Sequence, residues 1–309
     1  MVEILRPAAY GLLNIVTASG IVFANKTVFQ VYGFHFTIAL TWIHTLFTIV
    51  GMRIFLRAGM FEHRDLPKMR LLPLAAAFVA YIVLCNLNLN INTVGFYQIS
   101  KIAVAPAVLG LEAVLFGKRA SLQVVLSVVV VCAGIGLATV TDSQVATNAM
   151  GLLVGLGAVT STAMYQIFAG TKQKELQASS MQLLNEFAPQ AALLLGVLVP
   201  ILEPVGWREA GEGTLLGYRY SAGAVCAIFI SAALGLLVSL STFLVIGATS
   251  SLTYNVVGHM KTIIILTGGV LFFGDEMPPK KLLGVGVSLV GMVWYSQLKL
   301  RAAMQQSSK

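Results

Sequence analysis

Charged residues are scarce in this sequence. Asp, Glu, Lys and Arg together make up 10% of the 309 residues, whereas roughly a quarter of the residues in an ordinary soluble domain are charged. Hydrophobic residues make up 57% of the chain, and its mean hydropathy is +0.86. This composition excludes an ordinary soluble globular protein and indicates a polytopic membrane protein.

Residues that carry enzyme chemistry are also rare. The three cysteines each lie alone within a different apolar run, so we expect neither a disulfide framework nor a metal site. The aspartates form no Asp-x-Asp pair, and the adjacent Asp275 and Glu276 are interpreted as loop charge. We find no phosphate-cradling glycine loop and no nucleophile with its base. These absences count against a multi-span transferase, so we expect a protein that is not an enzyme and uses no cofactor.

Long apolar runs are what the sequence does have. Runs of about 20 residues, the length at which a helix crosses roughly 30 Å of hydrocarbon, recur along the chain. Most connections between them are short, so no soluble domain is inserted and residues 1–309 form a single transmembrane domain. We expect an all-α fold of ten transmembrane helices at about 8–31, 35–57, 72–91, 94–116, 121–139, 149–171, 179–202, 219–245, 250–273 and 280–298.

Basic residues outside the apolar runs are distributed unevenly between the two sides of the membrane. One side collects Arg6, Arg53, Arg57, Arg64, Lys68, Arg70, Lys118, Arg119, Lys172, Lys174, Lys299, Arg301 and Lys309, and the other Arg208, Arg219, Lys280 and Lys281. The positive-inside rule therefore places both termini in the cytosol. These flanking residues also explain the net charge of +8. Since they are scattered and lack interleaved aromatic residues, we expect no nucleic-acid partner.

The second half of the sequence resembles the first. A shift of 157 residues places Tyr97 on Tyr254 and likewise aligns glycines of the fifth and tenth spans. We therefore expect two five-helix repeats, at about 8–140 and 149–298, followed by a short cytosolic tail. Because five is odd, the second repeat must be inverted in the membrane relative to the first. Inverted repeats are an architecture of secondary transporters.

Lysines inside the apolar runs indicate an anion site. Lys261 lies near the middle of its span, and Lys101 shares a helix face with Tyr97 at i, i+4 spacing. A charge within the membrane is costly and therefore favours a partner or a water-filled cavity. Two lysines in corresponding spans, with few acids nearby, predict a negatively charged ligand. The alternative is that Lys101 or Lys261 pairs with Glu112 or Glu186, the carboxylates deepest in the apolar runs.

Other polar residues in the spans have plausible structural roles as well. Lys26 lies near a span end, where its side chain can extend to the membrane surface. Asn255 and His259 can instead hydrogen-bond to a neighbouring helix, and Gly258 can serve helix packing or leave room for a ligand. We retain these residues, together with Asn25, as candidates for ligand binding.

Three stretches of the sequence resemble one family of carriers. They are NTVGFYQISKIAVAP, YNVVGHMKT and the closing GVGVSLVGMVWYSQLKL. They are similar to the triose-phosphate translocator and nucleotide-sugar transporter family within the drug/metabolite transporter superfamily. The similarity covers nearly the whole chain and is greatest to Golgi members with a Lys-Thr pair in the ninth span, especially plant and algal carriers of UDP-sugars. It implies a ten-helix exchanger that brings a nucleotide sugar into the lumen and returns the nucleoside monophosphate.

The resemblance also implies roles for particular residues. The phosphate-holding lysines of the family match Lys101 and Lys261, the Lys-Thr pair adds Thr262, and the ninth-span tyrosine and glycine match Tyr254 and Gly258. Thr262 stands where plastid phosphate translocators have an arginine, which counts against triose phosphate. The Gly-Ala-Leu-Asn-Lys run of the GDP-mannose carriers is here Gly-His-Met-Lys, without the asparagine, which counts against GDP-mannose.

The resemblance places recognition of the base in the seventh span, which reads QLLNEFAP in this sequence. Gln182, Asn185 and Glu186 are the candidates there. In the fourth span, Tyr97 and Gln98 complete the set of residues expected to bind the sugar nucleotide.

The expected function is a nucleotide-sugar:nucleoside monophosphate antiporter that imports a UDP-sugar, of the galactose, xylose or rhamnose type, in exchange for UMP. The alternatives are a carrier of another phosphorylated or organic anion, as in the plastid translocators, and a multi-span transferase. We expect a multi-pass protein of the Golgi membrane, with the endoplasmic reticulum and the plastid inner envelope as alternative locations. A homodimer is left open.

Overall fold

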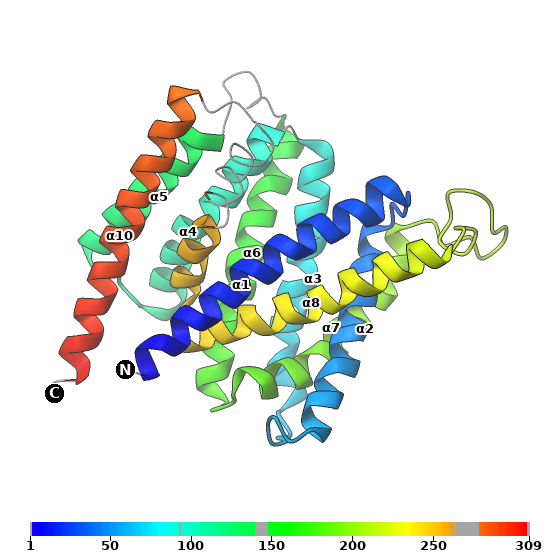
Figure 1. Cartoon of the computed structure of the whole chain (residues 1–309), viewed down its shortest axis with the longest axis horizontal. Helices are drawn as coiled ribbons and strands as arrows, with labels where there is room; N and C mark the ends of the chain where they lie inside the picture. Colours follow the sequence, from blue (N-terminus) through cyan, green and yellow to red (C-terminus); the bar gives the residue numbers. More distant parts are fainter. Residues whose placement is uncertain (1, 93, 140–147, 261–262, 264–277, 308–309) are drawn as a thin grey trace. The chain divides into compact units, whose positions relative to one another are not determined.

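The structure of this chain is a computed structural model that describes residues 2–92, 94–139, 148–260, 263 and 278–307 (Figure 1). Within these residues all regular secondary structure is helical, so the expectation of an all-α fold is confirmed. The labelled elements are α1 (Val2–Lys26), the π-helical turn η1 (Thr27–Val31), α2 (Thr37–Arg57), α3 (Lys68–Ile91), α4 (Val94–Phe116), α5 (Leu122–Thr139), α6 (Ala149–Glu175), α7 (Ser180–Leu202), α8 (Ala222–Ala248) and α10 (Pro279–Ser307). Residues 251–260 form a further helix.

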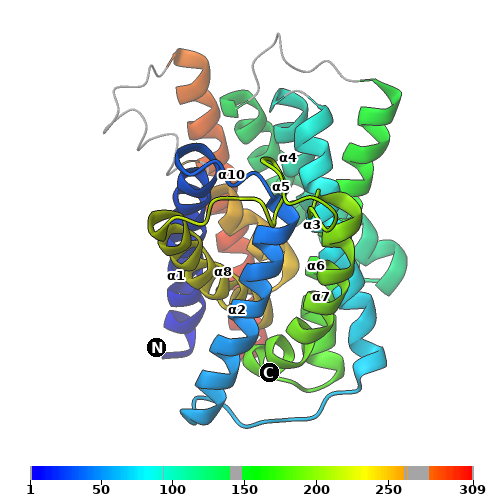
Figure 2. The ribbon, with the colours of Figure 1, turned by 90° about the vertical axis from the view of Figure 1, so that its right-hand side faces the viewer.

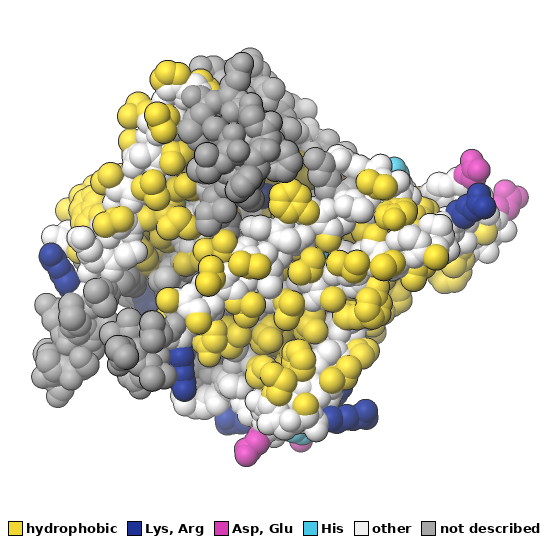
Figure 3. All heavy atoms as spheres, in the orientation of Figure 1, with side chains coloured by type: hydrophobic (Ala, Val, Ile, Leu, Met, Phe, Trp, Pro, Cys, Tyr) yellow, Lys and Arg dark blue, Asp and Glu magenta, His cyan; other side chains and the backbone are white. Residues whose placement is uncertain are grey.

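Seven of the described helical segments are long and apolar enough to cross a membrane. They are Arg6–Val31, Thr37–Arg57, Lys68–Leu89, Ile99–Phe116, Ala149–Glu175, Ser180–Leu202 and Ala222–Ala248. Leu122–Ala138 and Leu282–Leu298 are shorter apolar helices. Figure 3 shows hydrophobic side chains spread over the face formed by α1 and α8. Leu12 and Val16 of α1 and Phe229 of α8 are exposed. Such an apolar surface is typical of helices that contact lipid.

The chain divides into two compact units, and each unit takes segments from both halves of the sequence. The first unit comprises Met1–Val83 and Phe168–Ser250, and the second unit comprises Leu84–Ile167 and Ser251–Lys309. The first therefore contains α1, α2, α7 and α8 with most of α3, and the second contains α4, α5 and α10 with most of α6 and the helix 251–260.

In the first unit, α1 and α8 run side by side (Figures 1 and 2). A buried polar network joins them, in which the Asn14 amide donates to Ser241 Oγ at 2.9 Å and to Thr242 Oγ1 at 3.3 Å. Interhelical hydrogen bonds of this kind stabilise helix pairs in membranes, where burial of apolar surface between helices contributes little. The α2 helix packs against both α7 and α8.

The end of the first unit that contains the start of α2 is held by an aromatic cluster. Phe34 is fully buried, and its ring lies 5.2 Å from Phe36 and 5.1 Å from Tyr218, centroid to centroid, in edge-to-face geometry. The Tyr218 hydroxyl donates to the main-chain oxygen of Tyr32 at 2.7 Å, and Tyr220 packs on Tyr218 at 4.9 Å. These contacts tie the connection 203–221 between α7 and α8 to the turn that precedes α2.

In the second unit, α5 and α10 pack in closest contact at small residues. A Cβ added at Gly134 would lie 2.4 Å from the main-chain nitrogen of Ser288, and one added at Gly284 would lie 2.5 Å from that of Ala138. Neither position has room for a side chain. The two helices therefore touch main chain to main chain, as small residues permit in membrane helix pairs.

Candidate functional site

Lys101 and Tyr97 of α4 form a cation–π pair. The Lys101 Nζ lies 4.5 Å from the centroid of the Tyr97 ring, so the i, i+4 spacing in the sequence does bring the two side chains together. Lys101 is exposed and Tyr97 is half-buried. A cation over an aromatic face is attracted by the ring quadrupole, and this attraction holds the ammonium without neutralising it. The charge therefore remains available to an anion.

The carboxylates that could have neutralised Lys101 are engaged elsewhere. Glu112 lies 3.9 Å from Lys118, and Glu186 lies 3.7 Å from the Nδ1 of His63. No ion pair of Lys101 is found within the described part of the chain. The described residues therefore do not support an ion pair between Lys101 and Glu112 or Glu186. Lys101 stays a candidate anion-binding residue.

Close packing of α4 against α6 fixes the turn of α4 that precedes Lys101. A Cβ at Gly155 would lie 2.5 Å from the Phe96 ring and 3.3 Å from the Ser100 hydroxyl, so only glycine allows this approach. On α3, the Cys85 thiol lies 3.5 Å from the Thr162 hydroxyl of α6. This contact joins α3 and α6 within the second unit.

Gln166 of α6 is a residue that sequence reasoning missed. The Asn255 amide donates to Gln166 Oε1 and also to the main-chain oxygen of Ser251 at 2.9 Å. The Ser251 hydroxyl in turn donates to the main-chain oxygen of Gln166 at 2.8 Å. These bonds attach the helix 251–260 to α6. Asn255 therefore has a helix-anchoring role in this structure, and a partner 89 positions away along the chain leaves no local signal in the sequence.

The other candidates on the helix 251–260 differ in their surroundings. A Cβ added at Gly258 would meet no atom of the described residues within 4 Å, so packing against these residues does not explain this glycine. His259 is buried, and its Nε2 has no hydrogen-bond partner among the described residues. Tyr254 is half-buried. Lys261 and Thr262 lie outside the described residues, as does the conformation of the Gln98 side chain.

The three candidates on α7 belong to the first unit. Gln182 is used in capping: its Oε1 accepts from the Ser179 main-chain nitrogen at 3.0 Å, and its Nε2 donates to the Glu62 main-chain oxygen at 3.0 Å. With both ends of the amide occupied, Gln182 shapes the start of α7 and is not presented to a ligand in this conformation.

Asn185 and Glu186 interact with each other. The Asn185 amide donates to Glu186 Oε1 at 2.8 Å, whereas the Asn185 Oδ1 is buried and has no hydrogen-bond partner within the described part of the chain. A buried acceptor without a donor is costly. This oxygen is therefore a position at which a bound N–H group would gain a hydrogen bond.

Asn25 lies at the end of α1, where the helix changes to the π-helical turn η1. Its amide oxygen accepts from the Ser231 hydroxyl at 2.6 Å. The side chain of Lys26 lies outside the described residues. The site residues expected from the sequence are thus divided between the two units, with Asn25, Lys26 and the α7 set in the first and the remainder in the second.

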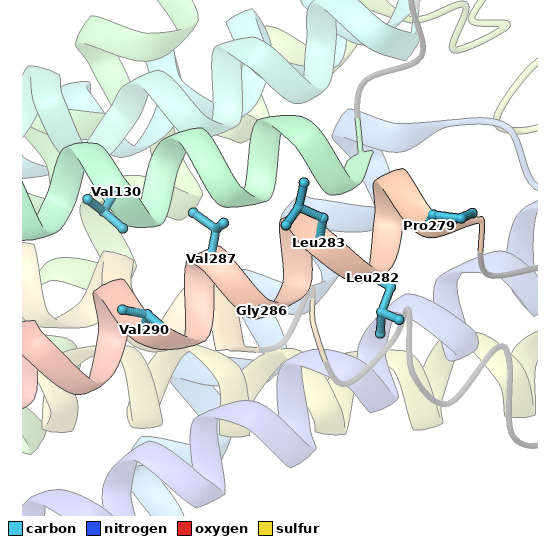
Figure 4. A pocket seen from close by; sticks show the side chains of 7 residues that line it. All are labelled: Val130, Pro279, Leu282, Leu283, Gly286, Val287 and Val290. Carbon is cyan, nitrogen blue, oxygen red and sulfur yellow. The ribbon is translucent and has the colours of Figure 1, made fainter.

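An open groove of about 570 Å³ beside α5 and α10 has no polar side chain in its lining to hold a phosphorylated ligand (Figure 4). It is lined by Val130, Pro279, Leu282, Leu283, Gly286, Val287 and Val290. Figure 4 shows Val130 contributed by α5 and the other side chains by α10. Within the described residues, no group of three or more His, Cys, Asp or Glu side chains is placed to hold a metal ion.

Known proteins resemble this chain over most of its length. It is 36% identical to UDP-xylose transporter 2 of Arabidopsis thaliana over 92% of this chain and 79% of that protein. It is 35% identical to UDP-xylose transporter 3 over 96% and 82% of the two chains, and 37% identical to UDP-rhamnose/UDP-galactose transporter 1 over 92% and 81%, both from the same plant. A solved protein structure shares the fold, with a TM-score of 0.75 at 11% identity over 96% of this chain and 98% of its own.

The family assignment rests on a sequence profile as well as on these relatives. Residues 10–296 match the profile of the Triose-phosphate Transporter family. The family and the named relatives are transporters, so the expectation that the protein is not an enzyme is confirmed. With a match that covers most of the chain and relatives above 30% identity, this chain belongs to the Triose-phosphate Transporter family.

Proposed function

We propose that this protein is an antiporter that imports a UDP-sugar, of the galactose, xylose or rhamnose type, into the Golgi lumen in exchange for UMP. The observation that carries the proposal is the similarity, over 92% of the chain or more, to relatives whose names specify UDP-xylose, UDP-rhamnose and UDP-galactose. The availability of Lys101 to an anion supports a phosphorylated ligand.

The fold that we propose for this activity has ten transmembrane helices, arranged as two inverted five-helix repeats at about 8–140 and 149–298 within one transmembrane domain. An even number of spans places both termini on the same side of the membrane, and the excess of basic residues favours the cytosol for that side. The helices that the structure describes lie at the expected spans, and this agreement supports the arrangement. Residues 264–277 lie outside the described residues and are not part of this comparison.

The proposed mechanism follows from charge. Lys101 and Lys261 each contribute a positive charge within the membrane, and we assign to both, with Thr262, the phosphates of the ligand. An empty carrier that moves these charges through a low-dielectric barrier meets a large penalty. A bound diphosphate or monophosphate neutralises them, so the loaded carrier changes conformation more readily than the empty one. Obligatory exchange is the consequence.

Recognition of the remainder of the ligand is assigned to polar and aromatic side chains. Tyr97, Gln98, Tyr254, Gly258 and His259 are proposed to line the path of the sugar nucleotide in the second unit. In the first unit Asn25, Lys26, Asn185 and Glu186 remain proposals, of which Asn185 has the stronger support because its buried oxygen lacks a donor. Gln182 and Asn255 are proposed to contribute as well, Gln182 through the start of α7 that it caps and Asn255 through the attachment of the helix 251–260 to α6.

Exchange in proteoliposomes tests the proposal. Vesicles preloaded with UMP should take up far more labelled UDP-galactose, UDP-xylose or UDP-rhamnose than empty vesicles, and equal uptake would contradict obligatory exchange. UMP should compete with each transported sugar nucleotide about tenfold better than GMP or CMP, and the reverse order would contradict the uridine assignment. Uptake that depends on internal phosphate or triose phosphate instead would favour a phosphate translocator.

A further inference from the structure

Basic residues gather where α2 ends and α3 begins, within the first unit (Figure 2). The stretch 53–70 contains five exposed basic residues, Arg53, Arg57, Arg64, Lys68 and Arg70. Its acidic residues are Glu62 and Asp65, so positive charge prevails along the stretch. In the orientation proposed above, these helix ends face the cytosol.

The connection between α2 and α3 is held in place by hydrogen bonds. The Arg64 guanidinium donates to the main-chain oxygen of Gln177. The Gln182 amide donates to the main-chain oxygen of Glu62 at 3.0 Å. Leu66, just before α3, is buried. Arg64 is therefore engaged within the protein, and the two helix ends on either side of it have defined positions.

The other four cations have no carboxylate partner among the described residues. They are Arg53, Arg57, Lys68 and Arg70, which we name the basic cluster. Asp65, the nearest carboxylate along the chain, lies 3.1 Å from His63 instead. By contrast, Lys172 at the end of α6 pairs with Glu175 at 2.7 Å. The charges of the basic cluster are thus not neutralised within this part of the chain.

The positions of these cations are unfavourable for the protein taken alone. Arg53 and Arg57 are at i, i+4 spacing on α2, where like charges repel each other. Lys68 and Arg70 lie in the first turn of α3, which contains no acidic residue. The positive end of the helix dipole disfavours cations there. An external anion relieves both kinds of repulsion.

Exposed methionines accompany the basic cluster. Met69, between Lys68 and Arg70, is 79% exposed, whereas Leu71 is fully buried. Met60, in the connection that follows α2, is 55% exposed. Apolar side chains flanked by cations are typical of surfaces that lie on a membrane, because the apolar groups enter the acyl region while the cations meet the headgroups.

We propose that the basic cluster, together with Met60 and Met69, is a binding surface for anionic phospholipids of the adjacent membrane leaflet. Groups of Lys and Arg directly beside a transmembrane helix on its cytosolic side attract such lipids, and the cytosolic leaflet is the one that carries them. A soluble phosphorylated anion makes the charge contact without the apolar one. The bound lipid neutralises the start of α3 and stabilises the two helix ends. This inference does not depend on which ligand the protein transports.

Thermal unfolding in detergent with added short-chain lipid tests the proposal on wild-type protein. Dioctanoyl phosphatidylserine should raise the Tm at lower concentration than dioctanoyl phosphatidylcholine, because only the serine lipid has a net negative charge. Added salt should reduce this preference, since exposed charges are screened. Glycerophosphoserine, which has the same headgroup and no acyl chains, should not raise the Tm at these concentrations.

Matched variants locate the surface. Lys68→Gln and Arg70→Gln should each raise the phosphatidylserine concentration for half-maximal stabilisation about fivefold, the effect of one basic residue near an anionic leaflet. Met69→Ser should weaken binding of the same lipid, and Met69→Leu should not. The control is Arg208→Gln, which removes an exposed cation from the connection 203–221 of the same unit and should leave the half-maximal concentration unchanged.

Three results would overturn the proposal. One is equal stabilisation of wild type by the serine and choline lipids, and another is stabilisation by glycerophosphoserine as strong as that by the lipid. The third is the same effect of Arg208→Gln as of Lys68→Gln, which would indicate net charge alone, or no effect of either, which would place the lipid elsewhere. The first two comparisons use wild-type protein, so they decide the matter even where a variant does not fold.

Discussion

The carboxylate of Glu203 lies 2.7 Å from the main-chain nitrogen of Ile38 and accepts its hydrogen bond. The second carboxylate oxygen accepts from the Ala39 nitrogen at 2.9 Å. Phe36, the N-cap residue of α2, makes no capping bond with its own side chain. The first turn of α2 is therefore capped by the residue that follows α7, 165 positions away in the sequence.

Glu203 should stabilise the start of α2. Glu203→Ala leaves the N–H groups of Ile38 and Ala39 without an acceptor, and we expect the protein to lose about 0.5–2 kcal/mol, the range for loss of a helix cap. Glu203→Gln keeps one acceptor oxygen and should lose less. Thermal unfolding in detergent measures both variants, and an alanine variant as stable as wild type would show that the cap contributes nothing.

The same residue should make stability depend on pH. Burial raises the pKa of Glu203, and the hydrogen bonds from Ile38 and Ala39 offset only part of that effect. A raised pKa means that the folded chain binds this proton more tightly than the unfolded chain, so this contribution to stability is greatest at low pH and is lost as pH rises through the raised pKa. Unfolding curves across that range should show the loss in wild type, relative to Glu203→Gln. A parallel dependence in both would exclude Glu203 as its source.

Lys101 should matter for ligand affinity and little for folding. Lys101→Ala removes a charge-assisted contact to the phosphate, so we expect the Kd for UMP to rise about tenfold or more. Lys101→Met, which keeps the apolar length of the side chain, should be as impaired. Lys118→Ala is the control, because Lys118 is an exposed lysine beyond the end of α4 whose partner is Glu112. Isothermal titration with UMP gives the three affinities, and normal binding by Lys101→Met would place the anion site elsewhere.

Gly134 of α5 and Gly286 of α10 should respond differently to substitution by alanine. Gly134→Ala inserts a methyl group 2.4 Å from the main chain of α10, and we expect about 1–3 kcal/mol of destabilisation from overpacking. At Gly286 a Cβ meets no atom within 4 Å in the part of the chain that the structure describes, so Gly286→Ala should be tolerated. Thermal unfolding in detergent compares them. Equal stability of the two variants would contradict the main-chain contact described here.

Much of the helical arrangement was predictable, because hydropathy reports directly on burial in the membrane. The expected span 94–116 coincides with α4, and 179–202 differs from α7 by one residue at its start. The prediction was poorer at ends that extend beyond the hydrocarbon. It began the third span at 72, whereas α3 begins at Lys68, and it ended the tenth span at 298, whereas α10 continues to Ser307. Charged and polar residues at these ends lower the hydropathy but do not stop a helix.

Pairs of polar residues were the part that the sequence did not reveal. The spacing of Tyr97 and Lys101 predicted their contact, because a helix brings i and i+4 together. In contrast, neither Gln166 as the partner of Asn255 nor Ser231 as the partner of Asn25 could be read from local periodicity. Such pairs depend on which helices become neighbours in space. The same limit applied to Gln182, whose use in capping required knowledge of where Glu62 lies.

The aromatic cluster around Phe34 also has a consequence for the thermodynamics of a transport cycle. A connection as long as 203–221 would lose considerable conformational entropy if it became ordered only when the carrier changes state. Here Tyr218 and Tyr220 already pack with Phe34, and the Leu215 nitrogen donates to the Pro204 oxygen at 2.9 Å. That entropy is lost once, at folding. The connection can therefore move together with the start of α2 as one ordered unit. No flexible loop then has to become ordered in each turnover.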